Sequence, residues 1–448
     1  MSLFGAINTA VSGLSAQSAS FGNISDNVAN SQTVGFKEVD TSFSDYITTS
    51  TATSNDPGTV IALPNYMNNV QGTITQSEAP LALAIDGQGF FPVSQVVGDS
   101  SNGVPTFSTT AAYTRAGDFQ MDKNGYLVNS GGDYLNGWSV NPTTGIVNRS
   151  SISPIQINQT VFNPVATANM TLAANLPATP TAGQPVSSQV DVYDSLGTAH
   201  PVILNWTQVA GTPTAWTVQI VSPDDQNATP TAAVTDASGN RVIGTMQVTF
   251  GTDGTIQSIG APVSDYGTVG NASNASAGTP ATFDFSTEFS AGTPQTIALN
   301  LGNYGQANGV TQFAGTNYTL RGISQDGVPP GGFSGVTTTS SGDIVVNYTN
   351  GQSRTIAQVP LVTFNDPNAL QRQNGQSFTA TNLSGNPVTN DAGTNGAGTL
   401  VTGSIESSNV DIATQFTKLI VAQQAYSANA KSVTTADQML QDTINMIR

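Results

Sequence analysis

The residue types that carry most enzyme chemistry are scarce in this sequence. There is one histidine, His200, and there is no cysteine. His200 stands in "DSLGTAHPV", beside a turn and before a proline, which favours a surface or hairpin histidine over a general base or a metal ligand. Paired carboxylates could act in acid–base chemistry, but the neighbouring Asp191 and Asp194 suit strand-end and turn positions. We therefore expect no catalytic residues, and a carboxylate-dependent hydrolase is the remaining enzymatic alternative.

Patterns for cofactor and metal sites are equally weak. "GQGFF" at 87–91 holds two of the three glycines of a dinucleotide fingerprint, but no helical pattern follows it. The lack of cysteine excludes disulfides, iron–sulfur clusters and thiolate zinc sites. We expect neither a cofactor nor a metal site.

The charge balance limits the possible partners. Only 9% of the 448 residues are charged, against about 25% in ordinary soluble domains, and the net charge is −17. Nucleic acid and anionic membrane surfaces require a protein surface of the opposite sign. No apolar run approaches the length of a membrane span, and the first basic residue is Lys37. We therefore expect no nucleic-acid partner, no membrane insertion and no secretory signal peptide.

The elements that would position these residues differ between the ends and the middle of the chain. Gly and Pro are frequent, 45 and 23, yet residues 404–448 contain neither and the first 56 residues contain no proline. Both ends are therefore expected to be helical. Between them, alternating apolar segments are joined by Asn-Gly or Asp-Gly turns, as in "FQMDKNGYLV" and "VTFGTDGTIQSI". This pattern predicts β-sandwich or barrel domains.

Both expected helices carry apolar residues at heptad spacing. One heptad column is apolar throughout: Ile7, Leu14, Phe21 and Val28 near the N-terminus, and Ile412, Leu419, Tyr426, Val433, Leu440 and Ile447 near the C-terminus. The second column is mixed: Phe4, Val11, Ser18 and Ser25, and then Phe416, Gln423, Ala430, Asp437 and Ile444. Asn30 and Gly35 would end the first helix, and Ser408 with Asp411 has the pattern of a capping box before the second.

The two columns predict two kinds of contact. Helices of roughly 27 and 37 residues, about 40 and 55 Å long, would overhang a small β domain. We expect the two helices to pair antiparallel through their apolar columns. The mixed columns would then face neighbouring copies of the chain, because small and polar residues permit close approach and fix the register. The alternative is that each helix packs on the β domain of its own chain.

The predicted fold class is mainly β with α-helical termini. Two zones bracket a candidate inserted domain: 171–188, which is rich in Ala, Pro and Thr, and 271–294, which is low in large apolar residues. We expect four parts: a coiled-coil-like helical domain from 1–36 with 404–448, an extended connecting region from 37–70 with 366–403, an inner β domain from 71–160 with 311–365, and an outer β domain at 161–310 inserted into the inner one.

Several segments resemble the bacterial flagellar rod and hook family. They are "ANSQTVGFK" (29–37), "AYTRAGDFQMDKNGYLVN" (112–129) and the stretch 403–440. "VDVYDSLGTAH" (190–200) and "VVNYTNGQSRTIAQVPLVTFNDPNAL" (345–370) resemble the hook members in particular. The motif residues that the resemblance indicates are Asn30, Gly35, Phe36, Lys37, Arg115, Gly117, Asp194, Gly197, Ser408, Asn409, Val410 and Asp411.

This resemblance implies a non-enzymatic hook subunit that assembles into a flexible helical tube and transmits torque from rod to filament, as a universal joint. It implies paired terminal helices in the inner tube, β domains in outer layers, and export through the flagellar type III apparatus to an extracellular location. The implied partners are further copies of the chain, a hook cap or scaffold protein, the distal rod protein, the hook–filament junction protein and the export apparatus. A distal rod or hook-associated junction protein is the alternative within the family, and a secreted β-rich adhesin is the alternative from another class.

Overall fold

The chain forms two compact units. The computed structural model describes residues 3–50, 55–99, 104–142, 144–181, 183–226, 234–236, 238–260, 263–264, 276–289 and 293–447. The first unit, here called the terminal unit, comprises Met1–Gln159, Ser334–Asn347 and Ser353–Arg448. The second, here called the inserted unit, comprises Thr160–Phe333 and Tyr348–Gln352.

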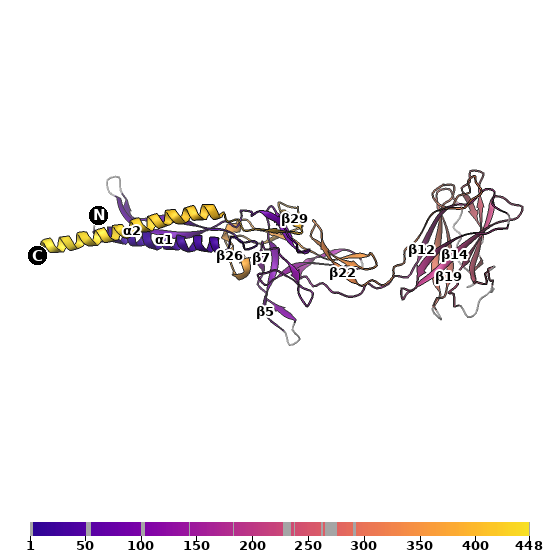
Figure 1. The fold of residues 1–448 in the computed structure, drawn as a ribbon, viewed down its shortest axis with the longest axis horizontal. Helices are drawn as coiled ribbons and strands as arrows, with labels where there is room; N and C mark the ends of the chain where they lie inside the picture. Colours follow the sequence, from indigo (N-terminus) through magenta and orange to yellow (C-terminus); the bar gives the residue numbers. More distant parts are fainter. Residues whose placement is uncertain are drawn as a thin grey trace. The chain divides into compact units, whose positions relative to one another are not determined.

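The inserted unit is a sandwich of two β-sheets (Figure 1). One sheet has the order β19-β20-β12-β21, and the other has the order β13-β14-β15-β16-β17 with β18 beside β16. Its strands are β12 (Asn169–Asn175), β13 (Val186–Tyr193), β14 (Ala199–Gln208), β15 (Ala215–Val221), β16 (Val242–Phe250), β17 (Ile256–Ile259), β18 (Val263–Ser264), β19 (Pro280–Thr287), β20 (Gln295–Asn303) and β21 (Thr319–Gln325). Burial alternates along β14 and β19, and the inward side chains of both sheets form one apolar cluster around Leu172, Trp206 and Phe283.

The end of the inserted unit differs from the expected boundary at 310. The unit continues to Phe333, because β21 pairs antiparallel with β12 and so completes the first sheet. The zone 271–294 suggested a domain boundary soon after it, but strand pairing carries the unit further.

The β body of the terminal unit, here β3–β11 and β22–β30, is built around a twelve-stranded sheet. Its main path is β22-β23-β24-β10-β5-β7-β27-β26, and three two-stranded sheets join β25 to β28, β29 to β4 and β3 to β30. The strands before the insertion are β3 (Ile74–Gln76), β4 (Leu83–Asp86), β5 (Phe91–Asp99), β6 (Pro105–Phe107), β7 (Ala112–Thr114), β8 (Gln120–Met121), β9 (Leu127–Val128), β10 (Asp133–Val140) and β11 (Val147–Pro154). The elements after it are β22 (Phe333–Thr338), β23 (Asp343–Tyr348), β24 (Ser353–Gln358), β25 (Leu361–Thr363), η1 (Pro367–Ala369), β26 (Gln371–Arg372), η2 (Asn374–Gln376), β27 (Ser377–Thr379), β28 (Val388–Asn390), β29 (Thr399–Thr402) and β30 (Ser404–Glu406).

Two segments expected to be an extended connecting region have different structures. Residues 366–403 belong to the β body, because β27 pairs with β7, β28 with β25 and β29 with β4. Residues 37–70 contain a long antiparallel hairpin of β1 (Val39–Ser50) and β2 (Asn55–Tyr66). Only the second of these segments is therefore distinct from the β body.

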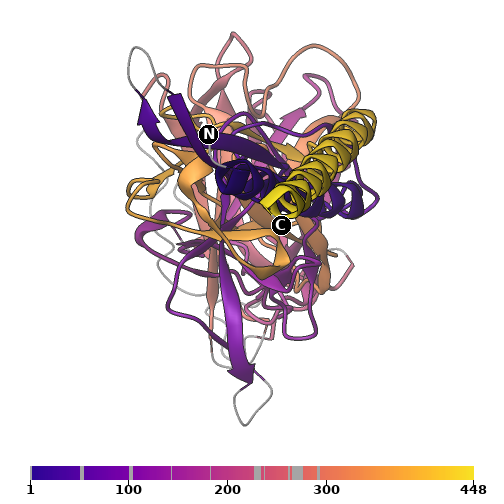
Figure 2. The same cartoon turned by 90° about the vertical axis from the view of Figure 1, so that its left-hand side faces the viewer.

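The two terminal helices are α1 (Leu3–Ala29) and α2 (Ile412–Ile447). They lie side by side and antiparallel, so that the two ends of the chain are at the same end of the pair (Figures 1 and 2). Neither described helix combines the length and the apolar character that a bilayer span needs. The predicted pairing of the N- and C-terminal helices is confirmed.

The start of α2 differs from the predicted capping box. The helix begins at Ile412, and the Asp411 carboxylate accepts a hydrogen bond from the Thr414 backbone N–H at 3.1 Å. The Ser408 hydroxyl instead accepts from Val410 N–H. Asp411 is therefore the N-cap itself, because its side chain rather than that of Ser408 satisfies a free N–H of the first turn.

Candidate functional site

The seam between α1 and α2 consists of small and polar residues. On α2 the buried column is Gln415, Ala422 and Ala436, with Asn429 half-buried between the last two; on α1 it is Ser20 and Asn27, with half-buried Gly13. The Asn27 side-chain amide donates to Gln415 Oε1 at 3.2 Å. A Cβ atom on Gly13 would lie 2.8 Å from Asn429 Nδ2. At Gly13, therefore, the Asn429 side chain fills the space that a larger residue on α1 would need.

The predicted apolar columns flank this seam instead of forming it. Ile7, Leu14, Phe21, Val28, Leu419, Val433 and Leu440 are half-buried, and Ile412 and Tyr426 are exposed. Phe21 and Tyr426 meet edge to face, with ring centroids 6.4 Å apart, and yet 43% of Tyr426 is exposed. The apolar columns therefore meet at the edge of the seam, at Phe21 and Tyr426, and the smaller side chains occupy its more buried centre.

The mixed columns are mostly uncovered in the single chain. Val11, Ser18, Ser25, Phe416, Gln423, Asp437 and Ile444 are exposed, and Ala430 is half-buried. Phe416 and Ile444 expose 53% and 61% of their surfaces. The side chains of Phe4 and Ile447 lie outside the described residues. The second face of α2 thus presents large apolar groups, and that of α1 presents Val11, which no part of the described chain covers fully.

The hairpin of β1 and β2 packs along α1 through polar contacts. The Thr9 hydroxyl donates to Gly58 O at 2.8 Å, and the Asn23 amide donates to the Thr41 hydroxyl at 2.9 Å. Asn27 bonds both backbone groups of Val39, at 2.9 and 3.0 Å. The Asn27 side chain therefore joins α1 to the hairpin and to α2 at once.

A charged contact fixes the first turns of α2 on this hairpin. Glu38 accepts from the Gln415 amide at 2.7 Å and from Lys418 Nζ at 3.0 Å, and Asp40 lies 3.2 Å from Lys418. Burial lowers the pKa of Lys418, but hydrogen bonds to Glu38 and Asp40 outweigh it, so the pKa is raised. Lys418 is therefore held in its charged form.

Where both helices join the β body, three charged side chains are buried together. Glu406 Oε1 lies 2.5 Å from Lys37 Nζ, and Glu406 Oε2 lies 2.9 Å from Arg115 Nη1. The exposed fractions are 0% for the Glu406 side chain, 1% for Lys37 and 4% for Arg115. Arg115 also donates to Gly87 O, and Lys37 to Val70 O. We call this group the junction cluster.

The electrostatics of the junction cluster are unbalanced, with two cations and one anion. Burial lowers the pKa of Lys37 to about 8, and nearby Arg115 lowers it further, against the opposing effect of Glu406. The single carboxylate is thus the group that makes burial of both cations tolerable.

Most of the predicted motif residues surround this cluster. Gly35 has φ +69°, and a Cβ there would lie 2.4 Å from Ala116 N, so that only glycine fits. A Cβ atom on Gly117 would lie even closer, 1.7 Å from Leu83 O. The ring of Phe36 is covered by the Arg372 guanidinium at 4.7 Å, and Asn409 accepts from Glu38 N–H. Asn30 is separate from this group, because its amide bonds Asp26 at the end of α1.

Sequence reasoning missed Glu406 and the small-residue seam. Glu406 was inside the quoted C-terminal stretch and is the only acid between Asp391 and Asp411. That isolation was a signal that could have marked it as the counter-ion of Lys37 and Arg115. The seam residues repeat every seven positions, but they were overlooked because the search was for large apolar groups.

In the inserted unit, Asp194, Gly197 and His200 shape one hairpin. Asp194 Oδ1 accepts from Leu196 and Thr198 N–H, and these bonds outweigh burial, so the pKa of Asp194 is lowered. Gly197 has φ +81°. His200 stacks on Phe289 with ring centroids 4.1 Å apart, and its Nδ1 lies 3.0 Å from Asp224. His200 belongs to a hairpin as expected, but its side chain is buried.

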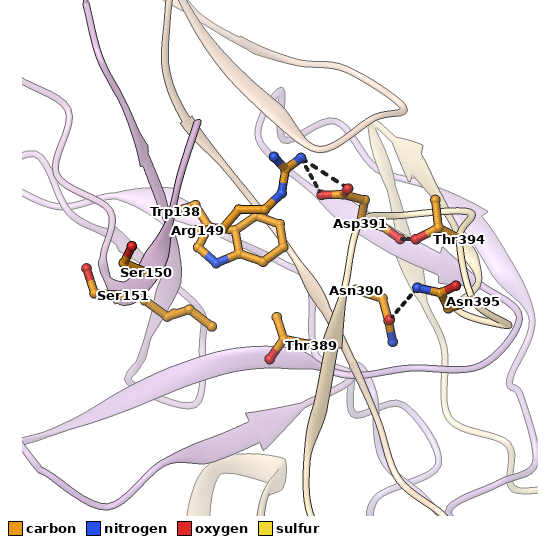
Figure 3. A pocket seen from close by; sticks show the side chains of 10 residues that line it. Trp138, Arg149, Ser150, Ser151, Thr389, Asn390, Asp391, Thr394 and Asn395 are labelled. Carbon is orange, nitrogen blue, oxygen red and sulfur yellow. Dashed lines mark hydrogen bonds and ion pairs between the residues drawn. The ribbon is translucent and has the colours of Figure 1, made fainter. Parts of the chain in front are cut away.

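A surface pocket of about 500 Å³ lies between β11 and the loop after β28 (Figure 3). The Arg149 guanidinium covers the Trp138 ring at 5.3 Å and bonds both oxygens of Asp391 at 3.1 Å. The residues that line this pocket include no histidine, and Asp391 is the one carboxylate among them. Across the described residues, no group of three or more His, Asp or Glu side chains is placed to share a metal ion.

Family models match the chain along most of its length. They are the flagella basal body rod protein (7–37), the flagellar hook protein FlgE/F/G D1 domain (84–173), the flagellar basal body protein FlaE D2 domain (157–328) and the flagellar basal body rod FlgEFG protein C-terminal region (401–446). The C-terminal match (401–446) includes Glu406, and the N-terminal match (7–37) includes Lys37; both residues belong to the junction cluster.

Full-length relatives carry the same description. The flagellar hook protein FlgE of Brucella suis is 29% identical, with all of both chains covered, and that of Salmonella typhimurium is 29% identical, with 98% of each covered. The crystal structure of Helicobacter pylori flagellar hook protein FlgE2 is 15% identical, with a TM-score of 0.47 over 74% of this chain and all of that one. The chain belongs to the flagellar hook proteins of the bacterial rod and hook family.

Proposed function

We propose that this chain polymerises by covering the exposed faces of α1 and α2 with those of neighbouring copies. Its family membership and full-length match make it a structural subunit of the bacterial flagellar hook. The observation that carries the proposal is the row of large apolar side chains left exposed along α2: Ile412, Phe416, Ile420, Val421, Tyr426, Met439, Ile444 and Met446. A helix with so few charges and so much exposed apolar surface is expected to be covered on more than one side.

The proposed polymer is a flexible tube that transmits torque. Terminal helices packed against each other would form its inner wall, and the β body and inserted unit would form its outer layers. The surfaces of the β units carry few charges, so they can slide past one another with little cost of breaking ion pairs. Such sliding would allow one side of the tube to shorten while the other lengthens during rotation.

The remaining partners and the location are proposed by analogy with the family. We propose that the subunit contacts a cap or scaffold protein during growth, the distal rod protein at one end and the hook–filament junction protein at the other. It would reach the extracellular hook through the flagellar export apparatus. The inserted unit argues against the rod alternative, because rod subunits in this family are shorter and lack such a unit.

The test compares two serine substitutions of exposed apolar residues. Phe416→Ser on α2 should leave monomer melting unchanged and abolish tube formation, as seen by sedimentation and electron microscopy. Leu383→Ser is the control, since Leu383 is exposed in the loop between β27 and β28 and belongs to neither helix. Tubes of normal yield from Phe416→Ser would refute the proposed interface.

A further inference from the structure

The junction cluster brings together three parts of the terminal unit through one charge from each. Lys37 lies in the segment that leaves α1, Glu406 ends the last strand before α2, and Arg115 follows β7 of the β body. Lys37 and Glu406 are 369 positions apart in sequence. Both helices are therefore attached to the β body at the same buried point.

Both oxygens of the Glu406 carboxylate accept hydrogen bonds within the junction cluster. Oε1 accepts from Lys37 Nζ and from Gly72 N–H at 2.8 Å, and Oε2 accepts from Arg115. The Glu406 carbonyl accepts from Gly35 N–H at 2.8 Å. When the segment before α2 docks, Glu406 therefore binds three parts of the chain at once. They are the segment after α1, the loop before β3 and the β body.

Before that segment docks, Lys37 and Arg115 have no carboxylate between them. Other charged groups on these segments have partners elsewhere: Glu38 with Lys418, Asp86 with Gln71, Asp118 with Ser130, and Arg372 with Phe36. Two buried cations without a counter-ion are strongly unfavourable, whereas removal of one cation from a cluster of two cations and one anion is not.

We propose that Glu406 is the positioning residue of the terminal unit, which locks the helix pair onto the β body by neutralising Lys37 and Arg115 together. The helix pair then has one fixed direction relative to the β body only when the C-terminal segment is docked. This inference rests on the proposed function only in its consequence, that a subunit with an unlocked helix pair adds poorly to a tube.

The test measures the lock in the monomer, so that its outcome is separate from polymerisation. The chain has no cysteine, so Gln423→Cys on α2 and Ser130→Cys on the β body, both exposed, allow two spin labels to be attached specifically. Pulsed electron paramagnetic resonance should give one narrow distance in the labelled wild type. Glu406→Gln keeps the shape of the side chain but removes its charge, and it should give a broad distribution. Lys37→Met should keep the narrow distance, because Glu406 and Arg115 remain paired.

Two further variants separate charge from shape. Adding both Lys37→Met and Arg115→Met to Glu406→Gln should narrow the distribution again, because no buried charge is then left without a partner. Adding Lys37→Met alone should leave the distribution broad, because Arg115 is still buried without a carboxylate. A purely steric role of the Glu406 side chain would give the same distribution in both variants.

Three outcomes would overturn the proposal. They are a narrow distance in Glu406→Gln, a broad distribution that adding both Lys37→Met and Arg115→Met does not narrow, and a Lys37→Met/Arg115→Met/Glu406→Gln chain that does not fold. The folding of this last variant tests the proposal even if Glu406→Gln alone fails to fold. If the lock behaves as proposed but the unlocked variant polymerises normally, the proposed function is at fault rather than the lock.

Discussion

Large apolar side chains are buried in the core of the inserted unit, but many of them are exposed on the terminal helix pair. In the inserted unit, Leu172, Trp206, Phe283 and their neighbours from both sheets are completely buried. Along α2, by contrast, the large apolar residues Phe416, Ile420 and Ile444 are more than half exposed. One region completes its hydrophobic core within a single chain, and the other leaves it incomplete.

This contrast indicates which parts of the chain depend on assembly. The inserted unit has the features of a domain that folds alone: two sheets, one shared core and alternating burial along its strands. The helix pair meets through small residues and keeps its large ones at the edge, where a further helix could cover them. Substitutions should therefore act on the monomer in the first region and on the polymer in the second.

The largest effect on the monomer is expected in the inserted unit. Phe283→Ala removes a fully buried ring from the centre of the sandwich, which typically costs about 3–5 kcal/mol of unfolding free energy. Chemical denaturation followed by tryptophan fluorescence would measure it, since Trp206 and Trp216 lie in the same cluster. An unchanged denaturation midpoint would mean that the core is not closed within the chain as described.

Asp133, a buried carboxyl group in the β body, allows a second test of monomer stability. Burial raises the pKa of this carboxyl to about 6, against hydrogen bonds with Gln95, Ser377 and Asn129 that lower it. The folded state therefore holds the proton more tightly than the unfolded state. Its stabilising contribution is complete below the unfolded pKa and is lost as the pH rises through about 6.

Asp133→Asn should remove that dependence on pH. Above about pH 6 the variant should be more stable than wild type by about 1–3 kcal/mol, because no charge is buried. Thermal melts of both proteins between about pH 4 and 7 would measure the difference. Parallel curves for the two proteins would show that Asp133 is not the group responsible.

The helix seam should respond less strongly than these cores. At Gly13 a Cβ atom would meet Asn429, so Gly13→Leu overpacks the seam and should cost about 1–3 kcal/mol. Gly22 is the matched control, because a Cβ atom there meets nothing within 4 Å. Gly22→Leu should instead stabilise α1 by up to about 1 kcal/mol, from helix propensity alone. Helical circular dichroism during melting would distinguish them, and equal effects at both sites would refute the close approach at Gly13.

The sequence was enough to predict the terminal helices, but not the residue contacts between them. Heptad spacing and the absence of Gly and Pro were enough to predict α2 and its pairing with α1. They could not identify the contacting face, because a column such as Gln415, Ala422 and Ala436 has no hydrophobic pattern of its own. The closeness of the helices, which makes that column the seam, is a property of the packed pair. In the same way, Lys37 and Arg115 were found as motif residues, but their pairing with Glu406 depends on segments that only folding brings together.

One substitution made at two positions of α2 separates its two faces, and the second position carries the smallest effect that we expect on the monomer. Ala422 lies in the seam and is buried, so Ala422→Leu should overpack it and cost the monomer about 1–3 kcal/mol. Ala430 lies two turns further along, in the mixed column beside exposed Gln423 and Asp437. Ala430→Leu should change the unfolding free energy of the monomer by less than about 0.5 kcal/mol. In a tube the added bulk would recur at every contact between neighbouring copies, so elongation should fail. Monomer melting and polymer yield, measured for both variants, separate the two faces of one helix. If Ala430→Leu elongates normally, the mixed column does not face neighbouring subunits, and the exposed apolar residues of α2 must be covered in another way.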